Sequence, residues 1–421
     1  MSHSRIARRT FVTGTAAVTG AAAFGVPAFI PKLGSAAETI PVGVTEELTG
    51  VYADPARNEQ RGMQLAVDER NKRGGVLGRP IQLVVEDSDN NPGIGVEKAR
   101  KMIQVDKVVA LMGCVNSAVA QATSGVAFEN STPFIDTGGH TDTVTGIDCH
   151  WTTFRVCHST WMETHATGNS IATKFGKKWY MLAPDYAFGH SLVTGYLDVA
   201  KTLGINIVGN DLAPLGTTDY SAYITKVIEA KPDCFIIMQQ GTDLIDALKQ
   251  CNSSGLLRTI PVAGPQGELE NFWALPTEAR VGYWGYEWYY NSPKVIGNSQ
   301  SARAFIKAYA ALYGNPPTER SAFGYIATTA LINAIDHAKS LDAVKICRAL
   351  EAVPVDALCY TSTQFRTVDH QLNWPMWFGN VRPNGTPGQP LNLFNVLDAH
   401  PGPSVMHSPD EQAKICHLGY P

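Results

Sequence analysis

Short apolar runs alternate with helical periods in the part of the chain that follows residue 37. In the segment 93–106, for example, Val96, Ala99 and Ile103 fall on one side of a helix. We expect strands at 40–44, 81–85, 108–112 and 134–135, and helices at 58–72, 93–106 and 118–129. Alternation at this spacing predicts βαβ units, and therefore a parallel sheet with helices on both faces.

The same alternation starts again after the segment 142–160, which we interpret as a crossover. We expect strands at 179–182, 205–211, 234–238 and 259–263, and helices at 162–175, 190–203, 220–230 and 242–253. This pattern predicts a second α/β unit of similar size. Helices expected at 299–313 and 321–339 return to the first unit, and the tail after Pro354, rich in Pro, Gly and Asn, predicts short strands and loops.

Two α/β units joined by strands form a cleft between them. In open α/β sheets, ligands bind beyond the carboxyl ends of the strands. The segments that follow the predicted strands are 45–57, 86–92, 113–118 and 136–141 in the first unit, and 183–189, 239–243 and 264–268 in the second. We expect the ligand-binding residues in these segments.

Composition and charge agree with a globular protein of two domains. The 421 residues are 44% apolar and 17% charged, which suits a large core. The formal net charge is −4, and it falls to −8 without residues 1–37, which hold four basic residues and no acidic residue. A mildly acidic chain without a nucleic-acid-binding motif is not expected to bind nucleic acid.

The first 37 residues have the features of an export signal. A twin-arginine pattern at 8–12 precedes a small, apolar run at 16–30, and small residues at 35–37 offer a cleavage site before Glu38. An apolar anchor helix is the alternative, but prolines interrupt the run and make a membrane span unfavourable. We therefore predict a twin-arginine signal peptide over 1–37 and a periplasmic location.

Eight cysteines are present, and an oxidising compartment permits disulfides between them. Cys149 and Cys157 are close in sequence within a polar loop, so we favour this pair, although the sequence does not fix the pairing. Each is followed by a histidine, His150 or His158, and the four side chains offer an alternative zinc site. We favour the disulfide and expect no metal.

Catalytic motifs do not occur in the sequence. It has no Gly-x-Ser-x-Gly turn, no phosphate-binding Gly-x4-Gly-Lys-Ser/Thr loop, no His-Glu-x-x-His helix and no Cys-x-x-Cys pair. Asp87 and Asp89 offer acid–base chemistry, but such a run is more typical of a solvated loop after a strand. We therefore expect neither an enzyme nor a cofactor.

Several short motifs occur together in a characteristic order. They are Leu48-Thr49-Gly50, Gly62, Asn71 with Gly74-Gly75-x-x-Gly78-Arg79, Asp87-x-x-x-x-Pro92, Gly113-x-x-Asn116-Ser117, Asp185-Tyr186-Ala187-Phe188-Gly189, Gly264-Pro265-Gln266 and Asp369-His370-Gln371. In this order and behind an export signal, the chain resembles the type I periplasmic solute-binding proteins of the leucine/isoleucine/valine-binding group of ABC importers. The resemblance covers nearly all of 38–380.

The resemblance implies a two-lobed α/β fold with a three-segment hinge, each lobe a parallel sheet flanked by helices. Lobe one is expected to comprise 38–158 plus 288–376, and lobe two 159–287 plus 377–421. In lobe one it implies ligand contacts by Asn116, Ser117, Gly138 and His140. A hydroxyl and free N–H groups at a helix start suit a ligand carboxylate, helped by the helix dipole, although Ser117 also fits a plain N-cap.

In lobe two the resemblance implies contacts by Phe188, Gln240 and Gln266. Phe188 is expected to close over the ligand, with core packing beside Tyr186 as the alternative. The position of Gln266 is commonly a glutamate that pairs with a ligand ammonium, and an amide supplies no countercharge. This difference favours a carboxylate-bearing ligand without a free ammonium. The rings of 283–290 either stack on an aromatic ligand, through Trp284, Tyr286 and Trp288, or fill space beside a crossover.

The predicted function is the capture of a small organic solute (an amino acid, an aromatic or other organic acid, or an amide) by hinge closure. The expected partners are the ABC permease subunits of the inner membrane, and we expect a monomer. Two alternatives remain: a periplasmic sensor module that signals to a partner, and an exported enzyme that uses the Cys/His cluster and a metal.

Overall fold

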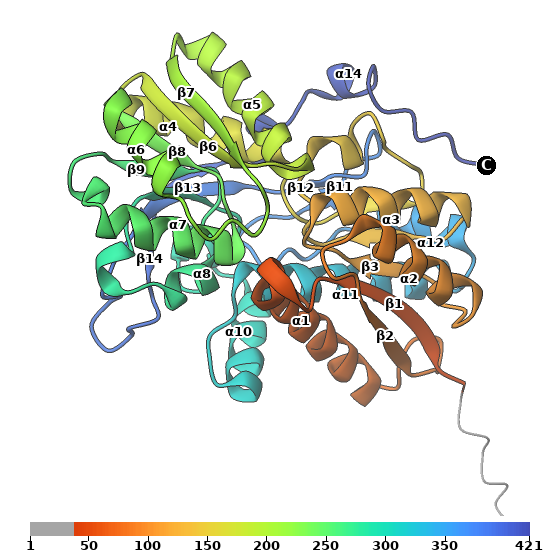
Figure 1. Cartoon of the computed structure of the whole chain (residues 1–421). Helices are drawn as coiled ribbons and strands as arrows, with labels where there is room; N and C mark the ends of the chain where they lie inside the picture. The colour runs from red at the N-terminus through yellow and green to blue at the C-terminus, as the bar shows by residue number, and fades with distance from the viewer. Residues whose placement is uncertain (1–37) are drawn as a thin grey trace, which may run out of the picture. The chain divides into compact units, whose positions relative to one another are not determined.

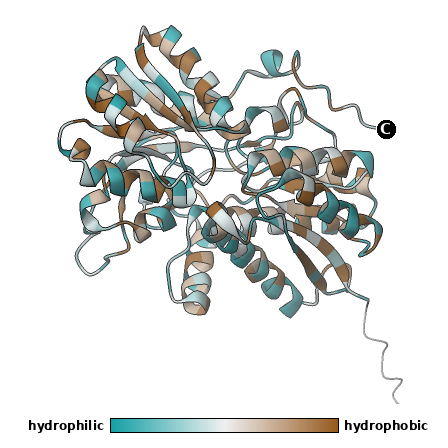
Figure 2. Ribbon diagram, viewed as in Figure 1, coloured by the Kyte–Doolittle hydropathy of each residue, from teal (hydrophilic) through white to brown (hydrophobic). Residues whose placement is uncertain are grey.

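The computed structural model describes residues 38–421, and the predicted export signal over 1–37 lies outside the described residues. Within 38–421, most helices pack around two main β-sheets (Figure 1). The helices outside the sheets carry hydrophobic and hydrophilic residues in alternation along their length (Figure 2), as expected when one face is buried. No helix of this part is both long and apolar enough to cross a membrane.

The first sheet has five parallel strands in the order β2-β1-β3-β4-β5. The strands are β1 (Ile40–Glu46), β2 (Ile81–Asp87), β3 (Leu111–Gly113), β4 (Phe134–Asp136) and β5 (Thr153–Arg155). Its helices include α1 (Ala53–Lys72), α2 (Pro92–Gln104), α3 (Ser117–Glu129), α11 (Glu319–Ala338) and α12 (Ala343–Ala352). The segment interpreted as a crossover, 142–160, instead supplies the edge strand β5, because Phe134–Asp136 pairs with it.

The second sheet has seven strands in the order β14-β13-β10-β9-β8-β6-β7. They are β6 (Lys178–Pro184), β7 (Asn206–Ala213), β8 (Cys234–Ile237), β9 (Val262–Gly264), β10 (Tyr283–Tyr286), β13 (Met376–Val381) and β14 (Phe394–His400). Neighbouring helices are α4 (Thr160–Phe175), α5 (Ala187–Leu203), α6 (Ser221–Ala230), α7 (Gly241–Ser253) and α8 (Leu269–Ala274). The tail returns here, and β13 pairs antiparallel with both β10 and β14.

Helix boundaries differ most from expectation at α1. It begins at Ala53, five residues before the expected start at 58, because a 3-10 turn at Gly50–Tyr52 leads directly into it. Pro55 is accepted there since the first turn of a helix needs no backbone donor. The early start brings Tyr52 and Glu59 beyond the carboxyl end of β1.

Helices α1 and α11 approach each other closely through two glycines. A Cβ on Gly62 would lie 1.9 Å from the carbonyl oxygen of Ser321, and one on Gly324 would lie 2.1 Å from that of Glu59. Side chains at these positions would push the helices apart. The close approach places the start of α11 against Glu59.

The aromatic run 283–290 packs in the core of the second sheet. Trp284, Tyr286 and Trp288 are all fully buried. Tyr286 stacks on Phe394 with ring centroids 4.1 Å apart, and Trp284 meets Phe272 edge-on at 5.4 Å. Of the two interpretations, space filling is therefore the one that the structure supports.

The disulfide joins Cys149 to Cys416, so the predicted pair Cys149–Cys157 is wrong. The C-terminal segment folds back over the 142–160 region, where Gln412 donates a hydrogen bond to the Thr145 carbonyl. Cys157 instead follows β5 into the core and is buried and free. The alternative zinc site is also not assembled, because Cys149 is bonded and His158 contacts Glu287 at 2.9 Å.

Breaking this disulfide is expected to destabilise the protein. Cys416→Ser should lower the free energy of unfolding by about 2–4 kcal/mol, because the bond closes a long loop in the unfolded chain. Urea unfolding under non-reducing conditions measures the change, and reductant should affect the parent protein but not the variant. A proteolytic peptide that links Cys149 to Cys157 would contradict the assignment.

Candidate functional site

A small cavity lies between the loops that follow the strands of the two sheets. It has a volume of about 10 Å³, room for about one water molecule, and is lined by Tyr52, Val115, His140, Tyr186, Phe188, Gln240 and Arg320. All of these except Arg320 come from segments that directly follow predicted strands. The carboxyl ends of both sheets therefore contribute to one cavity, as open α/β sheets do in ligand-binding proteins.

Aromatic rings form much of the cavity wall. The hydroxyls of Tyr52, from the first sheet's side, and Tyr186, from the second, hydrogen-bond at 2.6 Å. The ring centroids of Tyr186 and Phe188 are 6.1 Å apart, and those of Phe188 and His140 are 5.9 Å apart. Phe188 also packs in the core against its own sheet, as the alternative interpretation expected, and its closure over a ligand stays a prediction.

Arg320, at the start of α11, is buried between two carboxylates. Its Nη1 donates to Glu59 Oε1 at 2.9 Å, and its Nε donates to Glu268 Oε1 at 2.7 Å. Glu59 belongs to α1, and Glu268 follows β9 in the second sheet. A Cβ on Gly138 would lie 2.2 Å from Arg320 Nη1, so only glycine leaves room for the guanidinium. This triad links segments that belong to the two sheets.

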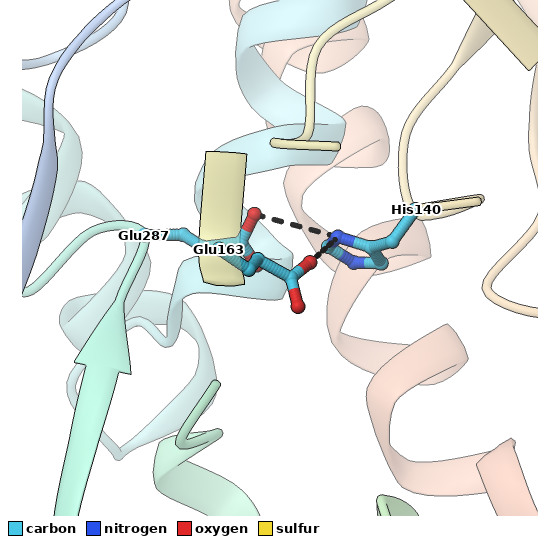
Figure 3. A group of neighbouring side chains, drawn as sticks. All are labelled: His140, Glu163 and Glu287. Atoms are coloured by element: carbon cyan, nitrogen blue, oxygen red, sulfur yellow. Dashed lines mark ion pairs between the residues drawn. The ribbon is translucent and has the colours of Figure 1, made fainter. Parts of the chain in front are cut away.

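His140, which lines the cavity, also belongs to a second buried group with Glu163 and Glu287 (Figure 3). His140 Nδ1 is 2.8 Å from Glu163 Oε1 and 3.5 Å from Glu287 Oε1. The same nitrogen is 2.9 Å from the His158 carbonyl oxygen, which only an N–H can satisfy. Burial lowers the pKa of His140 to about 3 and raises the pKa of Glu163 well above its ordinary value.

Among the described residues, His140, Glu163 and Glu287 are the group whose donor atoms lie close enough to hold a metal, all within 4.8 Å of one another. The proton on His140 Nδ1 leaves that nitrogen no lone pair for an ion in this arrangement. In this arrangement, the three side chains are better suited to share protons with one another than to bind a metal ion. The expected absence of a metal stays a prediction.

The start of α3 is the place where a ligand carboxylate was expected. Just before the helix, Val115 N and Asn116 N donate to a carboxylate of the chain itself, Glu47 Oε2, at 2.7 and 3.2 Å. Asn116 caps the helix through its side chain, and Ser117 Oγ accepts from Thr141 N at 3.1 Å. Glu47 is fully buried.

On the second sheet's side, the side chains of Gln240 and Gln266 both donate hydrogen bonds to the segment 264–268. Gln240 Nε2 donates to the Gln266 carbonyl oxygen at 3.1 Å, and Gln266 Nε2 donates to Glu268 Oε1 at 3.2 Å. The side-chain oxygens of both glutamines are buried without a partner. Glu268, two residues after Gln266, is an acid, but its carboxylate is paired with Arg320.

Three of the predicted site residues line the cavity: His140, Phe188 and Gln240. The other four, Asn116, Ser117, Gly138 and Gln266, are not among the residues that line it. Sequence reasoning missed Tyr52, Glu47, Glu59, Glu268 and Arg320. Tyr52 and Glu47 fall within the strand-end segment 45–57, where ligand-binding residues were expected. No local motif indicates Arg320, which lies in the first turn of α11, far along the chain.

The fold and the cavity agree with comparisons with known proteins. The family described as "Periplasmic binding protein" matches residues 39–386. The chain therefore belongs to the periplasmic binding protein family.

Individual relatives give the same picture. The chain is 27% identical over 350 residues to the Leu/Ile/Val-binding protein homolog 7 of Brucella suis, covering 80% of this chain and 86% of the relative. A periplasmic binding protein structure from Burkholderia mallei has a TM-score of 0.81 at 26% identity, covering 89% of this chain and 98% of that one. A solute-binding protein of an ABC transporter from Rhodopseudomonas palustris, in complex with benzoate, shares the fold, with a TM-score of 0.78 at 20% identity, covering 86% and 97%.

Removing the charge of Arg320 is expected to destabilise the fold strongly. Arg320→Met leaves Glu59 and Glu268 buried without a countercharge, which should lower the free energy of unfolding by about 3–5 kcal/mol. Urea unfolding at neutral pH measures the loss, and Arg303→Met, at an exposed arginine, is the control. A loss no larger than that of the control would show that the triad contributes little.

Stability is expected to fall as the pH rises from about 5 to about 8. Burial raises the pKa of Glu47 and of Glu59 to about 7 and that of Asp136 to about 8. In the unfolded chain, the pKa of such carboxyl groups is about 4. Between these values the folded state keeps protons that the unfolded state has released, so a rising pH favours unfolding.

Denaturant midpoints of the ligand-free protein, measured across this pH range, test the sign. Glu47→Gln should reduce the slope because the amide does not titrate, and the exposed Glu97→Gln should leave it unchanged. Stability that is constant or that rises with pH would contradict the expectation.

Proposed function

We propose that the chain is the solute-binding component of an ABC importer, which captures a small organic solute between two lobes. The observation that carries the proposal is the cavity, because its walls come from both sheets and it is complete only when they are close together. A ligand that contacts both walls favours the closed arrangement, which is how such proteins respond to ligand.

The relatives support this proposal through their own descriptions. One solved structure, 24% identical, is described as an amino acid ABC transporter substrate-binding protein from Pseudomonas fluorescens, and others were solved with benzoate or 3,4-dihydroxy benzoic acid. Amino acids and aromatic acids are therefore the first solutes to test. The closed protein would dock on permease subunits in the inner membrane and release the solute for uptake.

The proposal includes the arrangement of the chain. Residues 1–37 would direct export to the periplasm by the twin-arginine route. The lobes would comprise 38–158 plus 288–376 and 159–287 plus 377–421, with a hinge where the chain crosses between the sheets. The mature protein would act as a monomer and without a cofactor.

Capture of a solute from a mixture tests the function without a choice of ligand in advance. The purified protein is incubated with a small-molecule cell extract, washed and denatured, and the released compounds are identified by mass spectrometry. We expect one solute per chain, and a melting temperature raised by the extract, since a ligand at about 100 times its Kd adds about 2.7 kcal/mol of stability.

A variant of the cavity wall provides the control. Gln240→Leu should release at least about tenfold less solute, because a cavity-lining acceptor is lost, whereas Thr194→Val on the outside of α5 should match the parent. Retention of no solute by the parent, with an unchanged melting temperature, would contradict the proposed function.

A further inference from the structure

The chain crosses between the two sheets once more after β14. Strand β14 pairs with β13 at the edge of the second sheet, but the residues that follow it return to the first sheet. Cys416 is bonded to Cys149, which lies just before β5, and the family match ends earlier, at residue 386. We call residues 401–421, which make this crossing, the C-terminal strap.

The beginning of the strap packs on the second sheet's side. Val405 and Met406 are buried in one apolar cluster with Met162 of α4 and Met376 of β13. Helix α4 itself lies against the second sheet and α5. Separating the strap from α4 exposes this cluster to water, which is unfavourable. The beginning of the strap is therefore expected to move with the second sheet.

The next residue along the strap is held from both sides. The ring of His407 stacks on Trp161 of α4, with centroids 3.9 Å apart, and its carbonyl oxygen accepts a hydrogen bond from Arg366 Nη1 at 2.7 Å. Arg366 belongs to a hairpin that is attached to the first sheet, because the His370 carbonyl oxygen accepts from the backbone N–H at the end of β5 at 3.1 Å. The strap therefore passes from one side to the other at His407.

The rest of the strap is fastened to the first sheet's side. Gln412 is buried, and its Nε2 donates to the Thr145 carbonyl oxygen at 2.7 Å. The disulfide at Cys416 follows. Near the end of the chain, the guanidinium of Arg348, from α12, lies 3.4 Å from the ring centroid of Tyr420. Because the disulfide is covalent, it keeps the other groups close together, so their weaker contacts form again after they break.

The crossing itself has no slack. Met406 is buried against α4, and the backbone of His407, the adjacent residue, is bonded to the hairpin on the first sheet's side. Neighbouring Cα atoms are about 3.8 Å apart, so a larger displacement of α4 from the hairpin breaks one of the two contacts. The strap therefore opposes movements that separate the two sheets at this point.

We propose that the C-terminal strap is a fourth hinge segment, which limits how far the two lobes move apart and whose far end the Cys149–Cys416 disulfide locks to lobe one. The proposal rests on the proposed function, in which the lobes close on a solute, and it assigns 407–421 to lobe one instead of lobe two. A narrower range of open states leaves less conformational freedom to lose on closure. The strap acts from outside the cavity, because the residues that line the cavity all lie earlier in the chain.

Added slack at the crossing tests the restraint without removing a side chain. The insertion of Gly-Ser-Gly-Ser between Met406 and His407 adds up to about 13 Å of reach. Spin labels on unnatural amino acids at the exposed positions Glu97 of α2 and Lys201 of α5 report the distance between the lobes in the ligand-free protein. We expect the insertion to shift the distance distribution to longer distances, by up to the length of the added slack.

Matched controls separate lobe opening from loss of fold. The same insertion between Pro387 and Gly388, in the exposed loop that joins β13 to β14, should leave the distance distribution unchanged. A second pair of labels within lobe one, at the exposed positions Lys72 and Glu97, should keep its distance in every variant. A constant distance for this pair shows that the lobe remains folded.

Two substitutions test how the strap is fastened. Cys416→Ser frees its far end, and Arg366→Met removes the hydrogen bond to His407. We expect both to shift the distance between the lobes in the same direction as the insertion does. Arg303→Met, at an exposed arginine of α10 (Gln300–Tyr313), should leave that distance unchanged.

The outcomes distinguish this inference from the proposed function. If the insertion at the crossing leaves the distance distribution of the parent unchanged, the strap does not limit the lobes and the inference is wrong, even when the protein captures a solute from the extract. If the insertion lengthens the distance but no solute is captured, the restraint is supported and the proposed function fails.

Discussion

The guanidinium of Arg320 is the contact on which the arrangement of the site depends. A charge this deeply buried is tolerated only when it is paired and hydrogen-bonded, and its partners lie on different parts of the fold. Glu59 comes from α1, beside the first sheet, and Glu268 follows β9 in the second. The pairing therefore requires the two sheets to be close. The glycines at 62, 138 and 324 serve the same contact, because side chains there would collide with α11, the guanidinium or α1.

The rest of the interior has more acid than this arginine can balance. Carboxyl groups such as Glu47, Glu59 and Asp136 have raised pKa values because burial disfavours their charged forms. His140 is neutral for the same reason. Protons thus take the place of missing cations in the ligand-free protein. Such an arrangement is unfavourable for stability alone, and it is the kind of environment that proteins keep at functional sites.

The start of α3 illustrates how one backbone geometry can serve different ligands. Its free amides attract an anion in any sequence, but which anion arrives depends on the side chains nearby. Here Glu47, which follows β1, accepts the amides of the two residues that precede the helix and is held further by Ser88 at 3.0 Å. Relatives that share the fold can therefore differ in ligand without any change of backbone, which is why fold likeness alone does not identify the solute.

The sequence by itself determined most of the order of strands and helices, because periodicity reports which face of each element is buried, but it did not locate β5, β13 or β14. It also located the strand-end segments that supply Tyr52, His140, Phe188 and Gln240, since parallel strands deliver their carboxyl ends to one edge. The tertiary structure alone decided the pairs that are distant in the chain. Arg320 meets Glu59 across 261 residues, and Cys149 meets Cys416 across 267. A local sequence pattern does not predict such distant partners, because those contacts form only when separate elements pack together.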